Sequence, residues 1–124
     1  MQVGDTFFLG NEKNNRLHMY VILSRPDARG RVLCVSFRSS YPKFADKACV
    51  VIPGQYNHPF FRHESFADYS YAREIDIEII RVNVNGHRWP RSDRIPEGLV
   101  RALQEGARHS AFLAVKFRRF CDLF

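Results

Sequence analysis

The fold is decided by one stretch, Met19-Tyr20-Val21-Ile22-Leu23-Ser24-Arg25-Pro26-Asp27-Ala28-Arg29-Gly30-Arg31-Val32-Leu33-Cys34-Val35. Two apolar runs stand on either side of a turn in which Pro26, Asp27 and Gly30 favour chain reversal. Short runs rich in Val and Ile, separated by turn residues, are typical of neighbouring antiparallel strands. The stretch therefore predicts two paired strands at 17–24 and 31–38.

Further short strands are expected on both sides of this pair. The candidates are 3–9, 48–52, 65–73 and 75–82. In the last of these, Ile75, Ile77 and Ile79 alternate with other residues, at the period of a half-buried strand. Five or six strands within about 80 residues, with no helix between them, predict an antiparallel barrel or sandwich.

The tail of the chain follows a helical pattern. Asp93 is a candidate cap, and Gly106 is expected to weaken the helix by about 1 kcal/mol relative to Ala. Apolar residues recur at i, i+4 spacing at Leu99, Leu103, Ala107 and Ala111. A second helical segment would place Leu113, Phe117 and Phe120 on one side, either buried or facing a partner.

Length and composition predict one cytoplasmic domain, 1–124, with a β-rich body at about 1–84 and a helical tail at about 93–122. No apolar run approaches ~18 residues, so no membrane span is expected. The cysteines at 34, 49 and 121 lack metal-ligand spacing, and their odd number suits a reducing compartment. Cys34 and Cys49 lie in apolar runs and are expected to be buried.

The charge of the chain points to a nucleic-acid partner without requiring one. The net charge is +6, and 15 of the 19 basic residues are Arg, which binds phosphate through two parallel hydrogen bonds. The alternative is that these arginines are solvated surface residues. The five histidines show no metal-ligand spacing, and the chain has neither a Gly-rich phosphate loop nor a nucleophile elbow. Neither a metal nor a cofactor is expected.

One candidate catalytic site lies at the ends of the two paired strands. Arg16 and His18 stand where the first strand begins, and Arg38 and Ser39 stand where the second ends. RNA is cleaved without a metal when a base activates the 2′-hydroxyl, an acid protonates the leaving oxygen and cations stabilise the phosphate. His18 suits either proton-transfer role, Arg16 and Arg38 would hold the phosphate, and Ser39 would orient it. The alternative is an ordinary loop histidine among solvated arginines.

A second candidate region lies between 58 and 65. His58, Arg62 and His63 flank Phe60-Phe61, so the segment is either an RNA-binding wall of stacking rings and basic groups or a loop whose Phe pair fills the core. Tyr69 and Tyr71 alternate along a predicted strand, share one face on that pattern and would either extend the wall or belong to the core.

Five segments, taken in order, carry a family resemblance. They are Gly4-Asp5-Thr6-Phe7-Phe8-Leu9, Tyr20-Val21-Ile22-Leu23-Ser24, Val32-Leu33-Cys34-Val35, the run from Ser65 to Arg73, and Ile95-Pro96-Glu97 with the helix that follows. Together they resemble the MazF/PemK (Kid-like) toxins of type II toxin–antitoxin systems.

The resemblance implies a mainly β fold with α additions, a small curved antiparallel barrel of the Src-homology-3 type, like that of MazF, PemK and CcdB, with a C-terminal helix. It implies a metal-independent endoribonuclease that cleaves single-stranded RNA, forms a homodimer and is neutralised by an antitoxin. It also implies that Arg73 binds RNA.

Both catalytic positions depart from the family pattern. The family's Arg-Pro before the second strand reads His18-Met19 here, and its catalytic Thr or Ser after the third strand reads Arg38-Ser39. An alternative function is therefore a non-catalytic module that binds nucleic acid or protein on the same barrel, as the related gyrase-poison toxin acts by binding protein. A structural domain with an incidental basic surface is the third possibility.

Overall fold

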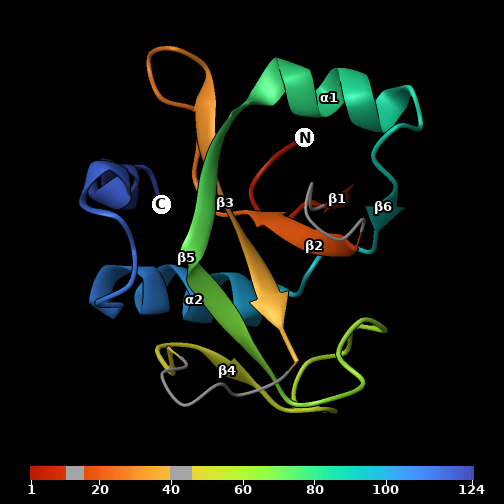
Figure 1. The fold of residues 1–124 in the computed structure, drawn as a ribbon, viewed down its shortest axis with the longest axis vertical. Helices are drawn as coiled ribbons and strands as arrows, with labels where there is room; N and C mark the ends of the chain where they lie inside the picture. Colours follow the sequence, from red (N-terminus) through yellow and green to blue (C-terminus); the bar gives the residue numbers. More distant parts are fainter. Residues whose placement is uncertain (11–15, 40–45) are drawn as a thin grey trace.

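The computed structural model describes residues 1–10, 16–39 and 46–124, and within them the chain forms one antiparallel sheet with helices on both faces (Figure 1). The strand order is β4-β5-β3-β2-β1-β6. The strands are β1 (Thr6–Gly10), β2 (Leu17–Ile22), β3 (Arg31–Arg38), β4 (Val50–Val51), β5 (Ser65–Asp76) and β6 (Arg91–Ser92).

The predicted pairing of the two central strands is confirmed. Tyr20 pairs with Ser36, Val21 with Val35, and Ile22 with Cys34. These strands form because their side chains are apolar on both faces, and helices cover the sheet on each side.

The turn between β2 and β3 uses the residues that the sequence indicates. The Asp27 carboxylate accepts hydrogen bonds from the backbone N–H groups of Arg29 and Arg31, both at 2.9 Å. Gly30 has a φ of 77°, a left-handed conformation that glycine adopts without strain.

The strand β5 contains an irregularity that turns two tyrosines in different directions. Its register against β3 shifts between the pair Cys34 and Arg73 and the pair Ser36 and Asp68. Tyr69 is fully buried whereas Tyr71 is 63% exposed. The prediction that both rings share one strand face is therefore wrong, because a bulge breaks the two-residue alternation between them.

The helix α1 (Ile77–Asn85) replaces the strand predicted at 75–82. Asp76 ends β5 and caps the helix, because its side chain accepts a hydrogen bond from the backbone N–H of Glu78 at 2.8 Å. Ile80 and Val84 then point into the core at helical spacing. The expectation that no helix lies between the strands is therefore wrong, because α1 separates β5 from β6 along the chain.

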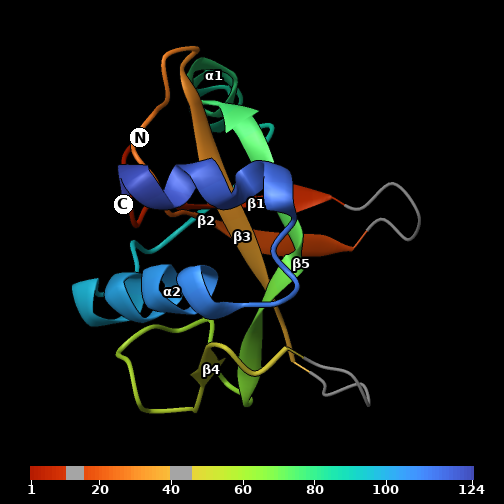
Figure 2. The same cartoon turned by 90° about the vertical axis from the view of Figure 1, so that its left-hand side faces the viewer.

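The tail is helical, as predicted, and covers one face of the sheet. The helix α2 (Glu97–His109) and the 3-10 helix η1 (Val115–Leu123) lie side by side there (Figure 2). Asp93 does not cap α2, since Pro96 occupies the cap position without a side-chain hydrogen bond, and Ala111 lies beyond the helix. Leu113, Phe117 and Phe120 are buried, so the apolar side of this tail belongs to the core.

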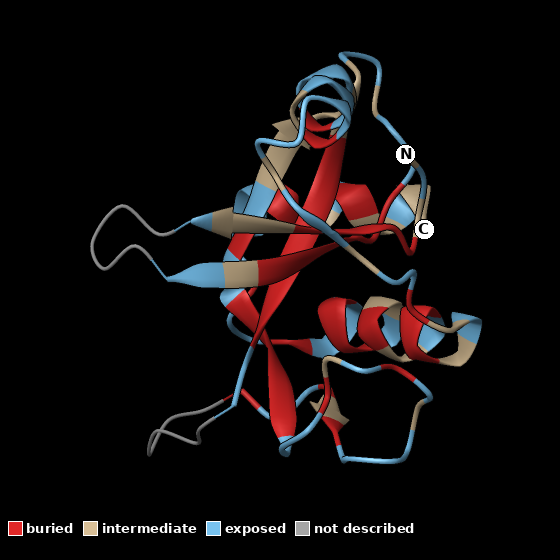
Figure 3. Cartoon of the chain, turned by 90° about the vertical axis from the view of Figure 1, so that its right-hand side faces the viewer, coloured by how far each residue is buried: buried red, intermediate tan, exposed pale blue. Residues whose placement is uncertain are grey.

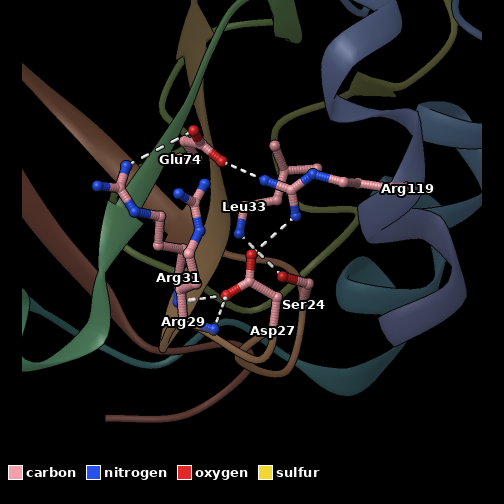
Figure 4. Close-up of polar contacts among 7 residues, drawn as sticks. All are labelled: Ser24, Asp27, Arg29, Arg31, Leu33, Glu74 and Arg119. Carbon is pink, nitrogen blue, oxygen red and sulfur yellow. Dashed lines mark hydrogen bonds and ion pairs between the residues drawn. The ribbon is translucent and has the colours of Figure 1, made fainter.

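An ion-pair cluster fixes η1 to the rest of the molecule (Figure 4). Arg119 binds Asp27 in the β2–β3 turn at 2.8 Å and also pairs with Glu74 of β5, which in turn lies 3.5 Å from Arg31. The guanidinium of Arg119 lies 4.0 Å from the centre of the Phe120 ring. Arg119 thus joins the tail to β5 and to the turn, and Glu74 extends the cluster to Arg31 of β3.

Two apolar clusters fill the two faces of the sheet. The larger lies under α2 and η1, and the smaller, which includes Phe7, Tyr20 and Ile80, lies under α1. Burial is concentrated in the central strands and on the sheet-facing side of α2 (Figure 3). Cys34 and Cys49 are buried, as predicted. Within the described residues no helix is long and apolar enough to cross a membrane.

The fold is mainly β with helical additions, as expected, but across the described ranges its sheet is open and does not close into a barrel. Its edge strands β4 and β6 have two residues each and lie at opposite ends of the strand order, so among the described residues they do not pair. Two such short strands offer too few backbone groups to join the edges of the sheet.

Candidate functional site

Two of the residues proposed for catalysis, His18 and Arg38, lie just beyond the point where β2 and β3 separate. The pair Tyr20 and Ser36 is the last that joins these strands, and His18 and Arg38 each lie two residues beyond it. There β2 stays paired with β1 and β3 stays paired with β5. Because side chains two residues apart point to the same face, His18 and Arg38 share the α1 side of the sheet with Tyr20. His18 is half-buried and Arg38 is exposed.

A buried carboxylate lies beside Arg38. Asp68 of β5 is only 6% exposed, and one carboxylate oxygen accepts a hydrogen bond from the Ser70 hydroxyl at 2.6 Å. The other oxygen is 3.8 Å from Nε of Arg38. Ser36 pairs with Asp68 on one side and Tyr20 on the other, so its hydroxyl lies on the same face. The α1 side of the sheet here thus carries a guanidinium, a carboxylate and hydroxyl groups on β3 and β5, and the His18 imidazole on the same face of β2.

Ser36 and Asp68 were not predicted from the sequence. Both stand inside strands that otherwise read as apolar, so they resemble interruptions of a core pattern. A charged residue within the buried run Ser65-Phe66-Ala67-Asp68-Tyr69 was the available signal, because a carboxylate in such a position needs a partner.

Arg16 and Ser39 lie at the margins of this region. Arg16 immediately precedes β2, Ser39 immediately follows β3, and both residues are exposed. The strands therefore bring them to the same end of the sheet as His18 and Arg38, next to the segments outside the described residues.

His58 is held inside the structure. It is 6% exposed, Nδ1 accepts a hydrogen bond from the Phe60 N–H at 3.1 Å, and Nε2 lies 2.7 Å from the Asp93 carbonyl oxygen. Since Nδ1 accepts, Nε2 must carry the proton and donate to that carbonyl. Both ring nitrogens are thus used within the fold, and the imidazole has no free nitrogen for RNA.

The rest of the second candidate region divides between core and surface. Phe61 is buried in the larger cluster, with its ring 4.9 Å from that of Phe37, and Phe60 packs against that cluster. Arg62 and His63 are exposed on the loop before β5. The Phe pair therefore fills the core on the α2 side, the face opposite His18, and the structure does not bring the two candidate regions together.

The remaining predicted residues, Tyr69, Tyr71 and Arg73, differ in how far their side chains are exposed to solvent. The Tyr69 hydroxyl donates to the Leu103 carbonyl at 2.7 Å, and burial raises the pKa of Tyr69 above its usual value. Tyr71 and Arg73 are exposed, and Arg73 pairs across the sheet with Cys34 on the α1 side. Tyr69 is a core residue, whereas Tyr71 and Arg73 are available to a ligand.

Burial favours the protonated form of the Cys34 and Cys49 thiols. Burial raises the pKa of Cys34 and raises that of Cys49 to about 11. In the part of the chain that the structure describes, no group of three His, Cys, Asp or Glu residues is arranged to hold a metal ion.

Comparison of the chain with protein-family models, with curated proteins and with solved structures gives no match.

Proposed function

We propose that this protein cleaves single-stranded RNA without a metal, on the α1 side of the sheet where β2 and β3 separate. The observation that carries the proposal is the strand register, which puts His18 and Arg38 at equivalent positions beyond the last β2–β3 pair. A proton-transfer group and a phosphate-binding group then flank the same point on one face.

The reaction would follow from the roles of these groups. A base removes the proton of a ribose 2′-hydroxyl, and its oxygen attacks the adjacent phosphorus. The bond from phosphorus to the 5′-oxygen breaks, and an acid gives that oxygen a proton. The products are a 2′,3′-cyclic phosphate and a 5′-hydroxyl. His18 and Asp68 would be the two proton-transfer groups, and Arg38, with Arg16, would stabilise the phosphate.

The toxin assignment extends this proposal and is supported by the sequence resemblance to the MazF/PemK family. Under this assignment the protein forms a homodimer, and an antitoxin blocks its activity. Its fold would be related to the barrel of those toxins. The net charge of +6 suits an RNA substrate. Induced expression is expected to arrest growth, and a small protein encoded beside it to restore growth.

The direct test incubates the purified protein with a long single-stranded RNA in EDTA and maps the new ends. Cleavage at specific positions, leaving cyclic phosphate, is the expected result. His18→Ala and Arg38→Ala should each reduce the rate by about 100-fold or more. His109→Ala and Arg101→Ala, which change exposed residues of the same types on α2, are the matched controls and should retain the rate.

Three outcomes would contradict this proposal. Cleavage that EDTA abolishes would show a metal-dependent reaction or a contaminant. Equal loss in the α2 controls would assign the effect to folding. RNA binding without cleavage would leave the non-catalytic binding module as the function of this surface.

A further inference from the structure

A groove of about 310 Å³ opens on the structure beside α1. Its apolar lining includes Leu9 of β1, Ile75 of β5, Ile79 of α1 and Trp89. Leu9 pairs with His18 across the β1–β2 ladder, so the groove begins beside the candidate catalytic histidine. A volume of this size lies at the small end of the range for ligand sites, which suits one flat ring system and not a folded partner.

The Trp89 ring is fixed before any ligand arrives. It stacks on the buried Phe7 ring with 5.4 Å between centroids and an angle of 18° between planes. The backbone N–H groups of Arg88 and Trp89 both donate to the Asn83 carbonyl, at 2.9 and 3.2 Å, which holds the turn after α1. An indole held in this way loses little conformational freedom on binding.

The charges in the groove leave one cation available. Glu74 is paired with Arg31 and Arg119, and Asp76 caps α1, so these acids already have partners. Arg73 lines the same groove and is exposed, and among residues 1–10, 16–39 and 46–124 no ion pair or hydrogen bond engages its guanidinium. An apolar slot with a free guanidinium at its side complements a ring that carries a phosphate.

The geometry points to a nucleobase subsite in this groove, in which a single-stranded nucleic acid places one base against Trp89 and an adjoining phosphate on Arg73. The inference deepens the proposed function, because it names the part of the substrate that is recognised next to His18. It concerns binding alone, so it can be tested separately from cleavage. Stacking on aromatic rings is the common mode for single-stranded chains.

The test uses the fact that Trp89 is the only tryptophan of the chain, so its fluorescence reports on the groove. The full-length protein is titrated in EDTA with a short 2′-O-methyl RNA, which it cannot cleave, and with the same strand lacking bases. The base-containing strand is expected to quench Trp89, and the abasic strand to bind more weakly without quenching.

Variants are compared by anisotropy of the labelled 2′-O-methyl strand. Trp89→Ala should weaken binding about tenfold, and Arg73→Gln should weaken it severalfold while quenching at saturation persists. Phe112→Ala, which removes an exposed aromatic ring outside the groove, is the matched control and should bind as the wild type does. Arg73→Gln keeps the test valid if Trp89→Ala does not fold, because Arg73 is exposed.

The outcomes separate this inference from the proposed function. Quenching without RNA cleavage would support the base subsite and reject the nuclease. Cleavage with no quenching, or with equal quenching by the abasic strand, would overturn the subsite and leave the nuclease standing. Quenching by a DNA strand as strong as that by RNA would support the subsite and show that it does not select the sugar.

Discussion

At the scale of single residues, Gly106 shows how packing reverses a helix preference. Glycine weakens a helix by about 1 kcal/mol relative to Ala, so the sequence alone marks Gly106 as a weak point of α2. In the structure a Cβ atom there would overlap the Tyr69 hydroxyl and lie 3.1 Å from both the Ala48 carbonyl oxygen and Cys49 Cβ. The missing side chain is what lets α2 approach β5 closely enough for Tyr69 to bond Leu103.

Gly106→Ala is therefore expected to destabilise the protein by about 1–3 kcal/mol, since crowding outweighs helix propensity. Urea unfolding measures the change in the free energy of unfolding. Gly98→Ala in the same helix is the matched control, because a Cβ atom there meets Tyr56 only at an ordinary 3.5 Å. It should be stabilising by up to about 1 kcal/mol. Equal effects of the two substitutions would refute the packing argument.

At the scale of elements, Asp27 connects the β2–β3 turn to η1. Hydrogen bonds from the backbone N–H groups of Arg31 and Arg29, with the Arg119 guanidinium, hold the pKa of Asp27 below its ordinary value of 3.8. The native state thus favours the charged carboxylate. Its contribution to stability is complete above pH 3.8 and is lost as the pH falls through the lower native pKa.

Asp27→Asn should accordingly be less stable than the wild type at neutral pH, and the difference should shrink below about pH 4 as the wild-type carboxylate takes up a proton. Thermal unfolding across the acid range measures it. In an Arg119→Gln background the same substitution should cost less, because the two groups interact directly. A difference that does not change with pH would rule out the charge of Asp27 as its cause.

The elements also show what the sequence could and could not predict. The strands β2 and β3 were predicted closely because their apolar runs and their turn are local signals. The helix α1 was missed because Ile75, Ile77 and Ile79 fit a strand period, while the decisive feature was the cap at Asp76. The bulge in β5, which separates Tyr69 from Tyr71, depends on packing against β3 and leaves no local mark.

At the scale of the whole molecule, the sheet is stable only when both faces are covered. The larger cluster depends on α2 and η1, and Phe120 within it is fully buried. Phe120→Ala is expected to lower the free energy of unfolding by about 3–5 kcal/mol, because it leaves a cavity in that cluster.

Phe112 offers the comparison for Phe120, since its ring is 47% exposed in the same tail. Phe112→Ala should cost well under half as much when both variants are unfolded in urea under the same conditions. Similar losses would mean that the tail does not close the core.

The positive charge of the molecule predicts a strong salt dependence of RNA binding. For single strands, each phosphate contact adds about −0.7 to the slope of log affinity against log salt concentration. If Arg73 contacts a phosphate, Arg73→Gln should make the slope less steep by about 0.7, whereas Arg101→Gln on α2 should leave it unchanged. Anisotropy of labelled 2′-O-methyl RNA at several salt concentrations measures both slopes, and an unchanged slope for Arg73→Gln would remove that contact.

The candidate site could be predicted only in part, because the topology of the whole fold brings together residues that are far apart in the sequence. His18 and Arg38 could be placed together because both adjoin strands that pair. Asp68 comes from a strand far along the chain, and Trp89 follows a helix that was predicted as a strand, so neither could be joined to them without the topology. The sequence also predicted His58 as an RNA-binding residue, but it could not reveal that both ring nitrogens form hydrogen bonds within the fold.

The division of the core into two clusters has a consequence for synthesis on the ribosome. Every buried member of the smaller cluster lies between Phe7 and Val84, whereas the larger one requires residues as far along as Phe120. When the chain has emerged from the ribosome only as far as Trp89, it therefore carries every buried member of the smaller cluster but lacks α2 and η1, which cover the opposite face of its sheet. Such an intermediate lacks the later members of the larger cluster, among them Leu99, Leu103 and Phe120, and a chaperone that binds apolar strands would find its target in that interval.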